Sequence, residues 1–152
     1  MRGLHLLVWL LALTWLVPTA SSASNVRLVK VLPHFMDRQG RVALNPSLYE
    51  RDAYQAYLRA HPAERGGLRF EVQWKSRELT HLTLKVELRG NQGKRGTTAS
   101  LEQSVRQSGL FSNWSRATLE GDAYAKFGEL SAWRATLWDG DKLLAEQKSF
   151  LW

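Results

Sequence analysis

The chain holds few residues of the types and spacing that catalysis or metal binding requires. Three histidines follow position 24, namely His34, His61 and His81, and each could serve as a zinc ligand or a general base. No two of them stand four residues apart, the spacing that places two imidazoles of one helix on one zinc ion. The chain has no cysteine and no G-x-S-x-G nucleophile sequence. We therefore expect no catalytic residue, no metal site and no cofactor.

Two other segments have part of the pattern of a ligand-binding loop. Residues 90–96 hold three glycines and two cations, but Leu88 stands where a phosphate-binding loop needs its first glycine. Arg95 likewise stands where that loop needs a serine or threonine. Asp139-Gly140-Asp141 could begin a calcium loop, yet no series of acidic ligands follows it. We expect 90–97 to be a loop and 139–141 to be the turn of a hairpin.

Aromatic and cationic side chains are the remaining candidates for contact with a ligand or partner. Trp114 and Trp138 lie beside predicted turns, where an exposed indole can stack on a sugar ring or on a partner protein. Arg51 and Arg59 share one side of a predicted helix with Gln55 and could form a small cationic patch. The ordinary alternatives are indoles partly buried at an end of the domain and a solvated helix face.

The first 23 residues follow the pattern of a secretory signal. Arg2 supplies a positive start, residues 4–17 are almost wholly apolar, and Ser21 and Ala23 are the small residues that signal peptidase requires before its cut. Fourteen helical residues span about 21 Å, which is short of the roughly 30 Å hydrocarbon core of a membrane. We expect 1–23 to be a cleaved signal peptide, with no transmembrane span after cleavage and a periplasmic or extracellular location.

Length and charge limit what remains. The 152-residue chain has room for one domain, which we place at residues 24–152, and its 44% hydrophobic content is too high for a disordered chain. With 21 Lys and Arg against 14 Asp and Glu the chain is basic, which could suggest nucleic acid. Cations and anions alternate along residues 69–75 and 81–89, however, unlike a surface that follows phosphates. We expect no nucleic-acid partner.

One helix is predicted at about residues 47–60, in the N-terminal half of the domain. Ser47 and Glu50 have the spacing of a capping box, in which each side chain bonds to the backbone of the other residue. A stripe of tyrosines and alanines follows at helical spacing and predicts the face that packs on the sheet. The stripe consists of Tyr49, Ala53, Ala56, Tyr57 and Ala60.

After Gly66-Gly67 the hydrophobic period changes from 3.6 to 2, which is typical of strands with one dry and one wet face. Residues 68–75 alternate in this way, and residues 80–89 repeat the pattern. Further strands are expected at 26–32, where Pro33 would end the strand, and at 98–105, 115–119, 130–138 and 142–151, with one helical turn at 122–128. About seven strands and one helix predict a mainly β protein, an antiparallel immunoglobulin-like β-sandwich.

The last two strands are predicted to form a hairpin with a three-residue loop at 139–141. Gly140 supplies the positive φ that a tight reversal needs. In this register Trp138 pairs with Lys142 and Ala135 with Ala145, which places residues of like character on each face.

Four segments together resemble a group of small exported bacterial proteins to which no activity is assigned. The segments are 29–35 (VKVLPHF), 47–55 (SLYERDAYQ), 132–140 (AWRATLWDG) and 144–152 (LAEQKSFLW). The resemblance implies export and a single domain of β-sandwich character, and it implies no functional residue.

The sequence thus favours an exported, non-catalytic binding or structural protein of the bacterial cell envelope, which contacts a protein partner through the surface of the sandwich. A carbohydrate-binding module that uses exposed tryptophans is the alternative, and a hydrolase with a site assembled from scattered residues is a weaker one. Coplanar Trp114 and Trp138 on an open face would favour carbohydrate, whereas a deep pocket that gathers histidines with a carboxylate would favour an enzyme.

Overall fold

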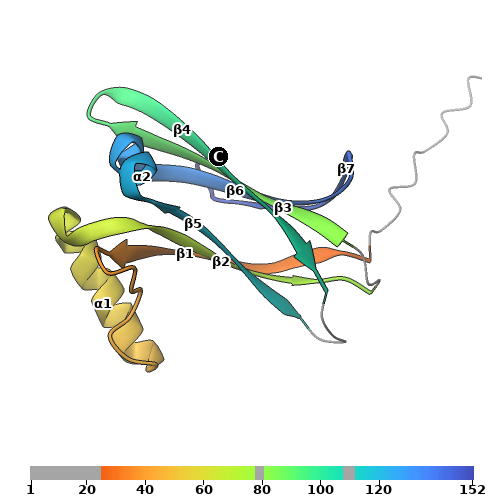
Figure 1. The fold of residues 1–152 in the computed structure, drawn as a ribbon, viewed down its shortest axis with the longest axis horizontal. Helices are drawn as coiled ribbons and strands as arrows, with labels where there is room; N and C mark the ends of the chain where they lie inside the picture. The colour runs from red at the N-terminus through yellow and green to blue at the C-terminus, as the bar shows by residue number, and fades with distance from the viewer. Residues whose placement is uncertain (1–24, 78–80, 108–111) are drawn as a thin grey trace, which may run out of the picture.

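A computed structural model describes residues 25–77, 81–107 and 112–152 of the chain (Figure 1). The predicted signal peptide, 1–23, lies outside the described residues, as does Thr80 at the start of one predicted strand. The strands are β1 (Arg27–Asp37), β2 (Arg65–Lys75), β3 (His81–Gln92), β4 (Arg95–Arg106), β5 (Asn113–Glu120), β6 (Glu129–Asp139) and β7 (Lys142–Lys148). The helices are α1 (Leu48–Ala60) and α2 (Gly121–Phe127), with a short 3-10 turn at Pro62–Glu64.

The strands form two antiparallel sheets that stack as a sandwich (Figure 1). One sheet has the order β1-β2-β5 and the other the order β4-β3-β6-β7. Helix α1 lies outside the sandwich beside β1, and α2 connects β5 of the first sheet to β6 of the second at one end. The expected mainly β architecture with antiparallel sheets is confirmed, with a second helix where a single helical turn was predicted.

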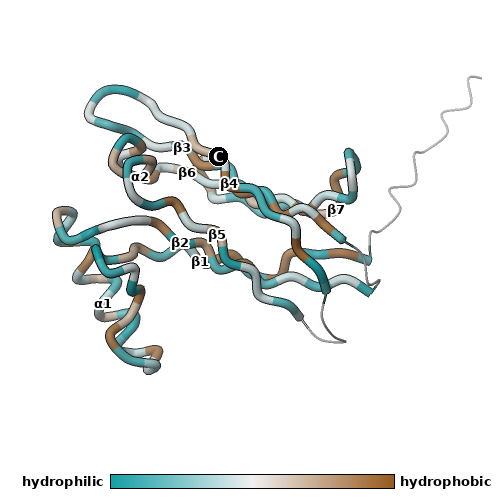
Figure 2. The backbone as a smooth tube through the Cα atoms, viewed as in Figure 1, coloured by the Kyte–Doolittle hydropathy of each residue, from teal (hydrophilic) through white to brown (hydrophobic). Residues whose placement is uncertain are grey.

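Alternating side chains of the two sheets build the core between them. Fully buried side chains come from β2 and β3 at every second residue, as the period of two predicts, and β6 adds more from the same side of the second sheet. These residues are Leu68, Phe70, Val72, Trp74, Leu82, Leu84, Val86, Leu88, Ala135 and Leu137. The largest of them, Trp74, is 0% exposed and donates its indole N–H to the hydroxyl of Ser115 at 2.9 Å. The tip of the β3–β4 hairpin, in contrast, is hydrophilic (Figure 2).

Several predicted strand boundaries are wrong, and the last strand ends at Lys148 and not at residue 151. Pro33 does not end β1, which continues to Asp37, because β1 is at the edge of its sheet and a proline there removes no necessary ladder hydrogen bond. Residues 90–97 are not a loop, since β3 and β4 pair as far as Gln92 and Arg95. Gly90 allows this arrangement because a Cβ at that position would stand 2.6 Å from the ring of Phe127.

The predicted register of the last hairpin is also wrong. Asp139 pairs with Lys142, so the turn contains two residues, Gly140 and Asp141, and Gly140 has the expected positive φ of 55°. A register shift then follows between Leu137 and Trp138. Beyond this irregularity the strand is displaced by two residues from the predicted pairing, which leaves the predicted faces unchanged.

Helix α1 packs with a different face from the predicted one. Tyr49 is 84% exposed, and Ala53, Ala56, Tyr57 and Ala60 of the same stripe are exposed too. The buried residues are Gln55 and Leu58. The capping box is likewise absent, because the Ser47 side chain caps no backbone N–H and the Glu50 carboxylate accepts a hydrogen bond from Asn45. Hydrogen bonds of the Gln55 amide to other parts of the backbone decide the rotation of the helix.

Within the described ranges, no helix combines the length and the apolar character that crossing a membrane requires.

Candidate functional site

The two candidate tryptophans lie in different sheets. Trp114 of β5 is 53% exposed, and together with Glu71, Ser115 and Arg116 it lines a hollow of about 400 Å³. Trp138 of β6 is half-buried and donates its indole N–H to the Thr136 hydroxyl at 2.8 Å. Because β5 and β6 belong to opposite layers of the sandwich, the two indoles do not form one coplanar stacking platform.

The two candidate arginines do not form the patch that the sequence predicts. Arg51 is half-buried, and its guanidinium lies 3.4 Å from the carboxylate of Asp52. Arg59 is exposed near the end of α1, where its carbonyl accepts a hydrogen bond from Arg65. Gln55, expected beside them on a solvated face, is 5% exposed. Gln55, which the prediction places between the two arginines, therefore turns toward β1 instead of toward solvent.

The three histidines remain apart. His34 of β1 is buried, with its Nε2 atom 3.8 Å from the Glu71 carboxylate; burial lowers the pKa of His34, while the charge of Glu71 acts in the opposite direction. His61 stacks on the ring of Tyr57, and His81 is exposed at the start of β3. No described residues form a group of three or more His, Asp and Glu that could hold a metal ion.

The four edge strands of the sandwich differ in how they are protected. Unpaired backbone groups of an edge strand can pair with another chain, and folded proteins usually cover or interrupt them. On β1 the side chain of Gln55 bonds to both backbone groups of Phe35, and Pro33 and two register shifts interrupt the strand. On β7, which has only seven residues, a register shift and the charged side chains of Lys142, Glu146 and Lys148 have the same effect.

Strands β4 and β5 lack the proline and the register shifts, although each carries an exposed charged residue near its middle, Glu102 on β4 and Arg116 on β5. Strand β4 pairs with β3 over twelve residues without a register shift, and β5 pairs with β2 over eight residues in the same regular way. Neither strand contains proline, and the outward side chains in the middle of β4 include Thr98, Ser100 and Ser104. Each strand is the last of its own sheet, and the two run along the same open side of the sandwich.

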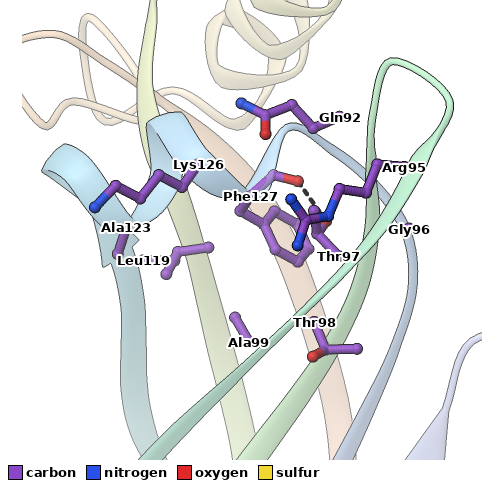
Figure 3. Close-up of a pocket in the computed structure, with 10 residues that line it drawn as sticks. All are labelled: Gln92, Arg95, Gly96, Thr97, Thr98, Ala99, Leu119, Ala123, Lys126 and Phe127. Atoms are coloured by element: carbon purple, nitrogen blue, oxygen red, sulfur yellow. Dashed lines mark hydrogen bonds between the residues drawn. The ribbon is translucent and has the colours of Figure 1, made fainter.

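Two consecutive hollows follow these edges. One of about 590 Å³ is lined by β4, by Leu119 of β5 and by α2, and it is shown in Figure 3. The next, of about 350 Å³, is lined by residues 100–103 of β4 and 116–118 of β5. Because their linings are adjacent along both strands, they define one groove, here called the β4–β5 groove, between residues 95–103 and 116–119 with α2 at one end.

The end of the groove at α2 is cationic above an apolar floor. Phe127, Ala99 and Leu119 form the floor, while Arg95 of β4 and Lys126 of α2 stand at the rim (Figure 3). Neither cation lies within 4.0 Å of a carboxylate in the part of the chain that the structure describes. The floor is fixed by Thr97, whose hydroxyl donates to the Phe127 carbonyl at 2.5 Å. Such a surface can bind an anionic group together with an apolar side chain.

Sequence reasoning missed this groove. The sequence places the cations Lys94 and Arg95 in an expected loop, and the alternating pattern of a strand does not reveal which strand ends a sheet. Comparisons of the chain with protein-family models, with curated proteins and with solved structures find no match. The function must therefore be argued from the geometry of the chain itself.

Proposed function

We propose that this chain is an exported, non-catalytic binding protein of the bacterial cell envelope, and that it binds a segment of a protein partner in the β4–β5 groove. Export is supported by the signal pattern of residues 1–23. The observation that carries the binding role is the pair of regular edge strands, without proline or register shift, with two hollows between them. An extended peptide can add to such an edge through main-chain hydrogen bonds.

We also propose that the sandwich is immunoglobulin-like, with one strand in an exchanged position. In the constant-type arrangement the first, second, fifth and fourth strands form one sheet and the third, sixth and seventh form the other. Here β4 pairs with β3 instead of β5, and the remaining order agrees. This position of β4 leaves β5 with a free edge and separates the two edges by the groove.

The binding role can be tested with a peptide library. Random ten-residue peptides displayed on phage are selected on the purified protein, and the selected peptides are measured against two variants. Ala123→Trp fills the hollow from α2, whereas Ala125→Trp places the same indole at an exposed position of α2 that does not line the groove. We expect Ala123→Trp to weaken binding about tenfold or more and Ala125→Trp to leave it unchanged.

The same peptides should shift backbone amide NMR signals of residues 95–103 and 116–119 and not those of β7. Peptides that bind equally well to the Ala123→Trp variant and shift signals elsewhere would show that the groove is not the binding surface. A library that yields no binder would lead to the same conclusion. Export is tested separately, since the protein recovered from the periplasm or the medium should begin at Ser24 in N-terminal sequencing.

Carbohydrate binding is a second candidate, supported by the hollow beside Trp114. The exposed indole can stack on a sugar ring, and Glu71 and Arg116 at the same hollow can bond to hydroxyl groups. If this function is correct, Trp114→Ala should abolish retention of the protein on an immobilised envelope polysaccharide. Trp138→Ala, on the other sheet, should not change the retention. Equal retention of both variants and the wild type would exclude this candidate.

A further inference from the structure

We propose that the partner segment in the β4–β5 groove is acidic, and that its carboxylates lie at the α2 end beside Arg95 and Lys126. This inference rests on the proposed function, and it adds the chemical class of the ligand. The hollow at this end is lined by two cations, two threonines and a glutamine, and by no aspartate or glutamate. A cationic rim of this kind attracts an acidic partner and disfavours a basic one.

The distribution of charged side chains along the groove indicates at which end the carboxylates of the ligand bind. Arg95 and Lys126 have no ion-pair partner within the described ranges, so a ligand carboxylate displaces no internal bond. Further along, Glu102 of β4 lines the second hollow together with Arg116, and Arg116 lies 3.8 Å from Glu71. An acidic side chain there would meet Glu102 and an arginine that is already paired.

The floor beside the cations selects a second side chain of the segment. Ala99 is half-buried, whereas Leu119 is 5% and Phe127 2% exposed, so the floor offers an apolar contact of small area, with Phe127 held by the bond of its carbonyl to Thr97. In an extended peptide, residues two apart point to the same side. The preferred segment therefore carries an aspartate or glutamate and, two residues away, an apolar side chain.

The test uses fluorescein-labelled peptides obtained from the library selection described above, each paired with a version in which every Asp and Glu is replaced by Asn and Gln. Binding is measured by fluorescence anisotropy to three proteins. They are the wild type, the double variant Arg95→Glu/Lys126→Glu, and the control Lys30→Glu/Lys142→Glu. The control variant changes the net charge by the same amount as the double variant, but its two substitutions lie on β1 and β7, the edge strands outside the groove.

We expect the wild type and the control to bind the acidic peptides about tenfold more tightly than their amide versions, a preference that falls as NaCl is raised. The Arg95→Glu/Lys126→Glu protein should lose this preference and bind the amide versions as the wild type does. Because a misfolded variant would bind neither peptide, unchanged affinity for the amide versions distinguishes the loss of a charge contact from a loss of folding.

The possible failures are distinguishable. If acidic and amide peptides bind the wild type equally and Ala123→Trp still weakens the binding of both, the inference of an acidic ligand is wrong, while the groove remains the binding site. If the control loses the preference as well, net charge and not the α2 end of the groove attracts the peptides, which also overturns the inference. If Ala123→Trp weakens neither peptide, the proposed function fails together with it.

Discussion

The side-chain amide of Gln55 bonds to both backbone groups of Phe35 and so occupies the place that a neighbouring strand would take. Gln55 Oε1 accepts the Phe35 N–H at 2.8 Å, and Gln55 Nε2 donates to the Phe35 carbonyl at 2.9 Å and to the Val42 carbonyl at 2.8 Å. Helix α1 thereby closes the free edge of β1 at this position. Because this position of β1 is occupied, we expect the proposed partner segment to bind on the side of β4 and β5.

Loss of the Gln55 amide should destabilise the fold. We expect Gln55→Ala to lower the free energy of unfolding by about 2–3 kcal/mol, because three backbone groups lose their partner in a buried site. Urea denaturation measures this change. The matched control is Gln92→Ala, which removes a single exposed hydrogen bond of 3.2 Å and should cost less than about 0.5 kcal/mol. Equal losses in the two variants would contradict the role assigned to Gln55.

The buried position of Trp74 predicts a large effect of truncation. Trp74→Ala should cost about 3–5 kcal/mol, because it leaves a cavity in the core and deprives the Ser115 hydroxyl of its donor. Lys94→Ala, at the exposed tip of the β3–β4 hairpin, should change the stability by less than about 0.5 kcal/mol. Thermal or denaturant melts of the two proteins provide the comparison, and a small loss for Trp74→Ala would be incompatible with this core.

At the start of α1, the side-chain hydrogen bonds are made by Asn45 and not, as the sequence predicts, by Ser47. The side-chain oxygen Oδ1 of Asn45 accepts the Ser47 N–H at 2.8 Å, and the side-chain nitrogen Nδ2 of Asn45 donates to the Glu50 carboxylate. Asn45→Ala should therefore cost about 1 kcal/mol, whereas Ser47→Ala should cost less than about 0.5 kcal/mol. Denaturant melts of both variants test this order. A larger loss of unfolding free energy for Ser47→Ala would support the capping box that the sequence predicts and contradict the role of Asn45.

The carboxylate of Asp37 should make stability depend on acid. Burial alone would raise the pKa of Asp37, but hydrogen bonds from the Arg41 and Gln39 N–H groups, the Arg41 guanidinium and the Tyr54 hydroxyl leave it below its ordinary value. The stabilisation is therefore complete above the unfolded-state pKa of about 4 and is lost as the pH falls through the lower folded-state pKa.

We expect the difference in unfolding free energy between the wild type and Asp37→Asn to be largest near pH 7 and to shrink below about pH 4. Chemical denaturation over this pH range measures it. Asp141→Asn, in the exposed turn between β6 and β7, is the matched control for the removal of one carboxylate. A pH-independent difference for Asp37→Asn would mean that its effect does not arise from the ionised carboxylate.

Helix α1 shows where sequence patterning stops being sufficient. The tyrosine and alanine stripe predicts the wrong buried face, because alanine gains little from burial and the tyrosines can remain partly solvated. Gln55, which looks like a surface residue, is buried because the edge of β1 offers it three hydrogen-bonding partners. These partners are up to twenty residues away in sequence, so local spacing contains no sign of them.

The hairpin of β6 and β7 shows a related limit. Alternation correctly predicts that Ala135 and Leu137 of β6 face the core, but it fails at the start of β7, where Leu143 is 45% exposed and pairs with Trp138. The register is wrong for two reasons, since the turn contains two residues instead of three and an irregularity between Leu137 and Trp138 then displaces the pairing by one more residue.

For this chain, the order of residues was enough to determine the antiparallel strands and the core side chains of β2 and β3, because alternation between apolar and polar residues is a local property. Which strands lie at the edges of the sheets was determined only by the tertiary structure. The position of these edges is why β4, β5 and α2 bring Arg95, Lys126 and Phe127 together at one groove. That decision depends on how strands distant in sequence pair and stack, and the free energy of those contacts does not belong to any single segment.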